Sequence, residues 1–132
     1  MEELKPIPDS FTIPIASRDF VFVECKMSSR ILVEIGAPIR DVETVQGMDW
    51  RCPVRFSGEK IEEVCSVCGI DSFQSLCLAF RLVRYTLEEL ERSLEGKIRF
   101  LESDFPPFED CEPLPHDSDF VMGSGHTWPV GW

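Results

Sequence analysis

The sequence lacks any uninterrupted apolar run of 18 residues, the minimum for a membrane-spanning helix. Its opening residues, MEELKPIPDS, carry acidic side chains where a secretory signal peptide has a basic region followed by an apolar one. Glycine-rich loops of the kind that bind phosphate groups are also missing. These absences predict a cytoplasmic protein without a membrane segment, and they give no indication of a nucleotide-binding enzyme.

Basic residues are missing from the last quarter of the chain. No lysine or arginine follows Arg99, whereas residues 100–132 contain seven of the 24 acidic residues, and the formal net charge is −11. Because excess negative charge repels nucleic-acid phosphates and anionic lipids, the composition argues against both as partners and favours a basic protein partner. The alternative is that the charge serves solubility alone.

The six cysteines are not expected to form a disulfide framework. With 132 residues, 43% of them hydrophobic and ten of them phenylalanine, the chain can bury the core of one domain without covalent cross-links. No export signal is present, and Cys25, Cys52 and Cys77 lie within apolar segments. Reduced thiols that pack as small hydrophobic side chains are therefore expected.

The first half of the chain predicts β-strands. Prolines keep the opening segment extended, so that SFTIPIAS can form only an edge strand or an extended arm. Residues 19–26 and 30–36 read as two strands joined at Ser28 and Ser29. The dozen residues from Ala37 onward interrupt the pattern, which favours a functional or mobile loop. Three residues of the second strand are expected to face the core: Ile31, Val33 and Ile35.

Three more strands are expected around residues 50–56, 60–68 and 97–101. In the first of these, WRCPVRF, apolar and polar residues alternate. Because Pro53 cannot donate a hydrogen bond to a neighbouring strand, it places this strand at a sheet edge or at a bulge. The side chains expected on one face of it are Trp50, Cys52, Val54 and Phe56.

One long helix follows the fifth strand. Asp71 and Gln74 have the spacing of a capping box, which starts the helix at Ser72, and Gly96 is expected to end it. A helix of about 25 residues measures nearly 38 Å, whereas strands of about seven residues span only ~23 Å. The helix is therefore expected to overhang the sheet. The apolar positions that define it are 73, 76, 77, 80, 83, 87, 90 and 94.

These elements predict an α+β fold, with an antiparallel sheet of four to six strands and one long α-helix packed on one face. Residues 1–101 form a single domain in this interpretation. Residues 102–132 are expected to form an irregular tail, which is acidic, aromatic and rich in proline, and which either packs on the domain or is partly disordered. An overhanging second half of the helix needs a cover, either this tail or a second copy of the chain, so a homodimer through that half of the helix is possible.

Cys65 and Cys68 have the spacing of a metal knuckle. A zinc site would need further ligands, and residues three apart in a strand point to opposite faces. Both thiols precede the helix, whereas a redox-active thiol lies at the helix N-terminus. Ser124 and His126 lack the rigid support of a nucleophile and its base. No catalytic, cofactor-binding or metal-binding residue is predicted. The further zinc donors considered are Cys52, Cys111, His116 and His126.

The tail combines aromatic rings with carboxylates. Aromatic side chains supply contact area at protein interfaces, and carboxylates attract a basic surface. The alternative is that the rings anchor the tail to its own domain, and the two roles are compatible. The predicted partner-binding residues are Glu102, Asp104, Phe105, Phe108, Glu109, Asp110, Glu112, Asp117, Asp119 and Trp128.

Two short patterns in the chain occur together. The first is W-x-C-P at Trp50, Cys52 and Pro53, and the second comprises Gly69, Ile70, Asp71, Ser72, Gln74, Leu76, Leu78 and Ala79. Over roughly residues 15–95, these patterns resemble a family of small, functionally uncharacterised bacterial domains, in which alanine stands at the position of Ser75. The resemblance implies a bacterial origin and an α+β fold, and it brings no catalytic residues.

In size, acidity and lack of a catalytic signature, the chain is also similar in kind to immunity proteins that neutralise bacterial toxins. This likeness implies a non-enzymatic protein that blocks a cationic toxin by direct binding. The first alternative is a small acidic secretion-type chaperone that acts as a dimer. The second is a small metal- or ligand-binding enzyme.

Overall fold

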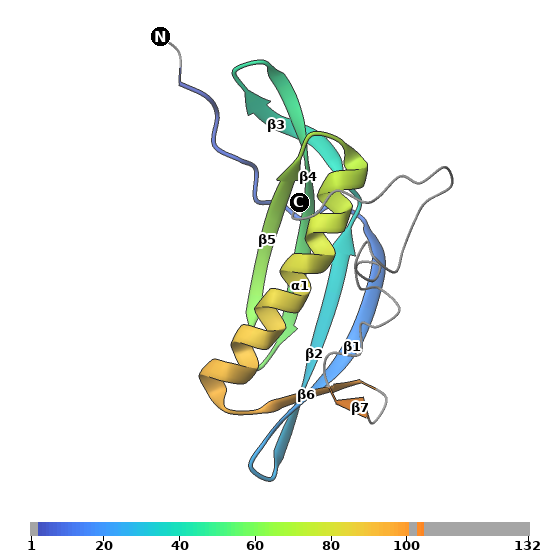
Figure 1. Cartoon of the computed structure of the whole chain (residues 1–132), viewed down its shortest axis with the longest axis vertical. Helices are drawn as coiled ribbons and strands as arrows, with labels where there is room; N and C mark the ends of the chain where they lie inside the picture. Colours follow the sequence, from blue (N-terminus) through green and yellow to red (C-terminus); the bar gives the residue numbers. More distant parts are fainter. Residues whose placement is uncertain (1–2, 101–102, 105–132) are drawn as a thin grey trace, which may run out of the picture.

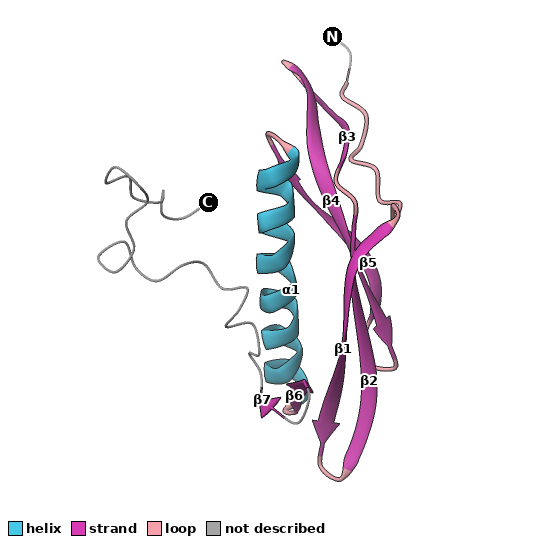
Figure 2. Ribbon diagram, turned by 90° about the vertical axis from the view of Figure 1, so that its right-hand side faces the viewer, coloured by secondary structure: helices cyan, strands magenta, loops and turns pink. Residues whose placement is uncertain are grey.

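The computed structural model describes residues 3–100 and 103–104, and it forms two layers (Figures 1 and 2). A seven-stranded, fully antiparallel sheet is one layer, and a single helix lying along one of its faces is the other. The predicted α+β class, with one long helix on an antiparallel sheet, is confirmed. Six strands have four residues or more, and the seventh, β7 (Ser103–Asp104), has two.

The sheet is built from hairpins. β1 (Pro14–Glu24) pairs with β2 (Met27–Gly36), β3 (Ile39–Thr44) with β4 (Gly47–Gly58), and β4 with β5 (Glu62–Gly69). The order is β3-β4-β2-β1-β6-β7, with β5 on the remaining side of β4. α1 (Ser72–Leu94) carries the chain from β5 across the sheet to β6 (Lys97–Phe100), which pairs with β1.

The core lies between the sheet and the helix. The predicted inward face of β2 is confirmed, since Ile31, Val33 and Ile35 are at most 4% exposed. On β4, three of the four predicted side chains are fully buried, and Trp50 is partly buried. The helix contributes buried side chains at a spacing of four: Ser75, Ala79, Val83 and Leu87.

The capping box begins α1 as predicted. The Gln74 amide donates to Asp71 Oδ1 at 2.7 Å, and the Gln74 side chain accepts from the amide of Ile70 at 2.9 Å. Ser75 is fully buried because the end of β5 lies against this first turn. A Cβ added to Gly69 would come within 2.7 Å of the Ser75 nitrogen. The second half of the resemblance pattern therefore describes a close strand-to-helix contact.

Two connections differ from the prediction. The β1–β2 turn consists of Cys25 and Lys26, with Glu24 opposite Met27, and so the two serines predicted as the turn lie inside β2. Cys25 adopts a φ of 54°, which the short turn requires and which sequence patterns assign to glycine or asparagine. The predicted long loop is the β3–β4 hairpin, because Val42 and its neighbours pair with the start of β4.

Pro53 does not mark an edge strand, since β4 has neighbours on both sides. It lies opposite Ser66 of β5, and its other side faces the place where β3 gives way to β2. Arg51 pairs with β3, and Val54 pairs with β2. The missing amide proton is tolerated at this irregularity in the pairing.

The predicted overhang of the helix is wrong. α1 has 23 residues, about 35 Å, whereas β4 has 12 residues, about 40 Å. Both the β3–β4 and the β1–β2 hairpins extend past the ends of the helix (Figure 2). Leu87 is fully buried and Leu90 packs against the core. The length mismatch that suggested a dimer is therefore absent.

The last residue of the helix is Leu94, and the residue that stops it is Glu95 in place of the predicted Gly96, because Glu95 adopts the left-handed conformation with a φ of 53°. Gly96 has a different role. A Cβ at this position would lie 2.2 Å from the ring of Phe22, and so the glycine allows the chain to pass close to the core.

Candidate functional site

The predicted partner-binding residues cannot be assembled into a surface. Asp104 belongs to β7 and lies opposite Arg99 in the sheet. The other nine, from Glu102 to Trp128, lie outside the described residues. The tail as a binding segment therefore stays a prediction.

The two cysteines of β5 point to opposite faces of the sheet, as strand geometry predicts. Cys65 lies opposite the buried Val54, whereas Cys68 lies opposite Arg51. Burial raises the pKa of both thiols, so the thiolate that metal binding or disulfide chemistry needs is disfavoured. Within residues 3–100, no group of three or more His, Cys, Asp or Glu side chains could hold a metal ion. Cys111, His116 and His126 lie outside the described residues.

Cys52 is a core side chain. It is fully buried, its thiol donates to the carbonyl of Gly36 at 3.3 Å, and burial raises its pKa to about 11. A thiol with this pKa is almost entirely protonated at neutral pH. The cysteine of the W-x-C-P pattern therefore contributes packing and a hydrogen bond.

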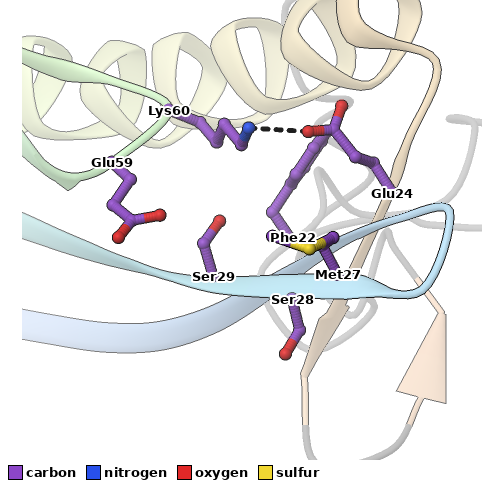
Figure 3. A pocket seen from close by; sticks show the side chains of 7 residues that line it. All are labelled: Phe22, Glu24, Met27, Ser28, Ser29, Glu59 and Lys60. Atoms are coloured by element: carbon purple, nitrogen blue, oxygen red, sulfur yellow. Dashed lines mark ion pairs between the residues drawn. The ribbon is translucent and has the colours of Figure 1, made fainter.

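A small cavity lies beneath the β1–β2 hairpin (Figure 3). Its volume is about 30 Å³, enough for one water molecule and too little for an organic substrate. The Lys60 ammonium pairs with Glu24 at 2.6 Å on one side of it, and Ser29 points into it. The buried Ser29 Oγ has no hydrogen-bond partner among the described residues. A bridging water would satisfy this hydroxyl.

A cluster of polar side chains surrounds Arg51 on the sheet face opposite the helix. The Arg51 side chain is 1% exposed, and it forms a bidentate ion pair with Asp41, at 2.8 Å from Nε and 3.1 Å from Nη2. It also donates to the carbonyl of Ser10 at 2.7 Å and to the hydroxyl of Ser66 at 3.0 Å. One arginine thus connects β3, β5 and the segment that precedes β1.

That segment, residues 3–13, is defined here as the N-terminal arm. The guanidinium of Arg55 lies 4.1 Å from the centre of the Phe11 ring and pairs with Glu34 at 2.8 Å. The Thr12 hydroxyl donates to the carbonyl of Ala37 at 2.8 Å. The arm is therefore fixed across the sheet, on the face that α1 leaves uncovered (Figure 2).

Sequence reasoning did not identify this cluster. The alternation in WRCPVRF places Arg51 and Arg55 on the polar face of a strand and says nothing about their partners. Asp41 could have been paired with Arg51 only if the β3–β4 hairpin had been recognised. Every N–H donor of Arg51 is matched to an acceptor. The arrangement is therefore a structural clamp, which holds β3, β5 and the N-terminal arm together.

The solvent side of α1 carries an unusual row of side chains at a spacing of four residues: Phe73, Cys77, Arg81 and Tyr85. We call this row the helix ridge. Phe73 is 62% and Tyr85 is 63% exposed, although Phe73 was predicted to belong to the buried stripe. Ile70, just before the helix, is 74% exposed. The buried stripe of the helix starts at Ser75 instead.

Comparison with known proteins identifies a family and no characterised relative. Residues 16–107 match the model of a family described as a domain of unknown function, DUF6968. No curated protein and no solved structure matches the chain. No helix within the described residues is long and apolar enough to cross a membrane.

Proposed function

For this chain, which belongs to the DUF6968 family of unknown function, we propose a non-enzymatic role: it binds and neutralises a basic bacterial toxin, as an immunity protein does. The segment that makes the contact is the acidic, aromatic tail. Carboxylates attract the cationic partner, and the aromatic rings supply the buried contact area.

The distribution of charge carries this proposal. All 13 basic residues lie at or before residue 99, and several of them are neutralised by carboxylates within the domain. The pairs are Arg30–Asp19, Arg51–Asp41, Arg55–Glu34, Lys60–Glu24, Arg84–Glu88 and Arg92–Glu89. Residues 100–132 have seven acidic groups and contain no lysine or arginine. The uncompensated charge is therefore concentrated where a partner can be steered to it.

The polar groups of the described domain support a binding role over a catalytic one. The Arg51 cluster is satisfied by its own partners, and the cavity of Figure 3 holds no more than a water molecule. The thiols of β5 have raised pKa values. Within the described residues, the Arg51 guanidinium and the Cys52 thiol thus both contribute to folding.

The first test is co-expression of the chain with the product of an adjacent gene in a bacterial host, choosing a gene that encodes a basic protein. We expect that product to arrest growth alone and growth to resume when the chain is present. In binding measurements, the dissociation constant should be nanomolar and should rise steeply with salt. Growth arrest that the chain does not relieve would contradict the proposal.

A charge-neutralised tail gives the sharper test. Changing Glu112, Asp117 and Asp119 to their amides should lower the association rate at low salt by roughly tenfold. The matched control changes three exposed acids of the domain, Glu3, Asp9 and Glu59, to amides and should change the rate less than about twofold. Equal effects of the two triple variants would place the contact elsewhere.

A further inference from the structure

The helix ridge is an apolar and basic strip on a side of α1 where an amphipathic helix is normally polar. Its two aromatic rings are more than three-fifths exposed. Single exposed apolar side chains are common on protein surfaces, but here they recur on one row of a helix. Such a row is typical of a surface that another segment covers.

The charge on this part of the helix is positive. From Ser72 to Leu87 the helix contains Arg81 and Arg84 and no acidic residue, whereas four glutamates follow between residues 88 and 95. Arg81 is exposed, and no ion pair is recorded for it among the described residues. The ridge therefore offers a cation between two aromatic rings, which suits a segment that is both acidic and aromatic.

The chain itself contains such a segment. Residues 105–132 have five acidic residues, no basic residue and five aromatic rings. This segment follows β7, which pairs with β6, the strand that comes directly after α1. The last described residue therefore lies at the same end of the molecule as the C-terminal end of the helix, beyond β6 (Figures 1 and 2).

The length of the segment is sufficient. Twenty-three helical residues measure about 35 Å, whereas 28 extended residues reach about 90 Å. Because the segment is tethered, its effective concentration at the ridge is in the millimolar range, and a weak contact is enough to hold it. A free partner of the same chemistry would need a much higher affinity.

We propose that residues 105–132 lie along the helix ridge in the free protein, with aromatic side chains against Phe73 and Tyr85 and carboxylates on Arg81. The toxin of the proposed function would then compete with the ridge for the tail. The docking itself does not depend on that function, because it concerns the chain alone.

Cross-linking of the full-length variant Arg81→Lys tests the docking. This change keeps the positive charge and adds an amine that a carbodiimide couples to nearby carboxylates. We expect cross-links from position 81 to the acids of residues 105–132, at least ten times more frequent than those from Lys26 in the β1–β2 turn. An equal mixture of isotopically light and heavy protein separates links within one chain from links between chains.

Each result of the cross-linking either supports or contradicts the docking of the tail on the ridge. Intrachain links from position 81 to the tail support the proposal. Links that are only interchain assign the ridge to a second copy and overturn it. If cross-links to the tail are no more frequent from position 81 than from Lys26, the tail does not cover the ridge, and this result also overturns the proposal.

The reactivity of Cys77 provides a second measurement without a change to the ridge. Converting the five acids of residues 105–132 to amides should raise the alkylation rate of Cys77 in the full chain several-fold, because the cover is released. Cys25, exposed in the β1–β2 turn, is the internal control and should react at an unchanged rate. An unchanged rate at Cys77 would contradict the docking, whatever the result with the toxin.

Discussion

At the scale of single residues, the buried guanidinium of Arg51 holds together parts of the chain that are distant in sequence. Changing it to methionine removes the donor shared by Asp41, Ser10 and Ser66, whose own side chains are partly or fully exposed. A hydrogen bond to a charged group in such a partly buried site contributes about 1.5–3 kcal/mol, and so Arg51→Met should lower the free energy of unfolding by about 2 kcal/mol or more. Urea denaturation followed by circular dichroism measures it.

Arg40→Met is the matched control for Arg51→Met. Arg40 is exposed and donates one hydrogen bond to the carbonyl of Met48, and its loss should change stability by only about 0.5 kcal/mol. Adding Asp41→Leu to Arg51→Met should restore part of the loss, since the unpaired carboxylate is then gone. Equal losses for the two single variants would show that the clamp does not hold the sheet and arm together.

At the scale of elements, the end of the helix gives a test with two opposite signs. Glu95 is left-handed, a conformation that costs a non-glycine residue about 1 kcal/mol, and so Glu95→Gly should stabilise the protein by about that much. Gly96→Ala should destabilise it by at least 1–3 kcal/mol, because the new methyl group meets the Phe22 ring. Thermal denaturation of both variants checks the signs.

If glycine at residue 96 were the helix stop that its sequence position indicates, Glu95→Gly would destabilise the protein, and Gly96→Ala would cost less. Gly96→Ala would then cost only the strain of a left-handed alanine, and Glu95→Gly would weaken the last helical turn. The sequence pattern places the helix end to within one residue. The contact with Phe22 shows that Gly96 allows a close approach to the core and is not the helix stop.

The helix and the strands could be predicted from the sequence where a local pattern of residues is compatible with only one kind of structure. The alternation of β4 and the Asp71–Gln74 capping box specified a strand and a helix start, because each pattern has few alternatives. The β1–β2 turn was misplaced because Cys25 adopts a conformation that sequence patterns assign to glycine. The β3–β4 hairpin was missed because its turn, Val45 and Gln46, lacks both glycine and proline.

The candidate sites were harder to predict, for a physical reason. Arg51 obtains its partners from residues 10, 41 and 66, and no local pattern records a contact between distant strands. The exposure of Phe73 depends on which side of the first helical turn meets β5, which the close approach of Gly69 to Ser75 decides. The acidic tail was visible from composition alone, since charge needs no fold to be counted.

At the scale of the whole molecule, the question is whether a single copy of the chain is stable without a second copy. Leu87 is fully buried within a single copy, so Leu87→Ala should lower the free energy of unfolding by about 2–5 kcal/mol. The urea midpoint of the parent protein should not change across a hundredfold range of protein concentration. A midpoint that rises with concentration would favour the predicted homodimer, whose stability includes association.

Net charge also acts at this scale. The domain up to residue 99 is nearly balanced, with 13 basic and 17 acidic residues, while the remainder carries −7. A molecule with such a separation resembles a weakly acidic body, with a net charge of −4 (13 − 17), joined to a polyanionic segment. Its long-range field therefore originates from the tail, and salt should weaken encounters with cationic proteins more than it changes the stability of the fold.

The pairing of β1 with β6 has a consequence for folding during synthesis, because the two strands are far apart in the sequence. Phe22, in the second half of β1, lies opposite Ile98 of β6. These two strands therefore cannot pair until the chain has been synthesised beyond the helix. At an elongation rate of roughly 5–20 residues per second, that delay is about 4–15 s. During this interval the nascent β1–β2 hairpin presents bare aromatic rings, and it is the stage at which chaperones would have most to protect.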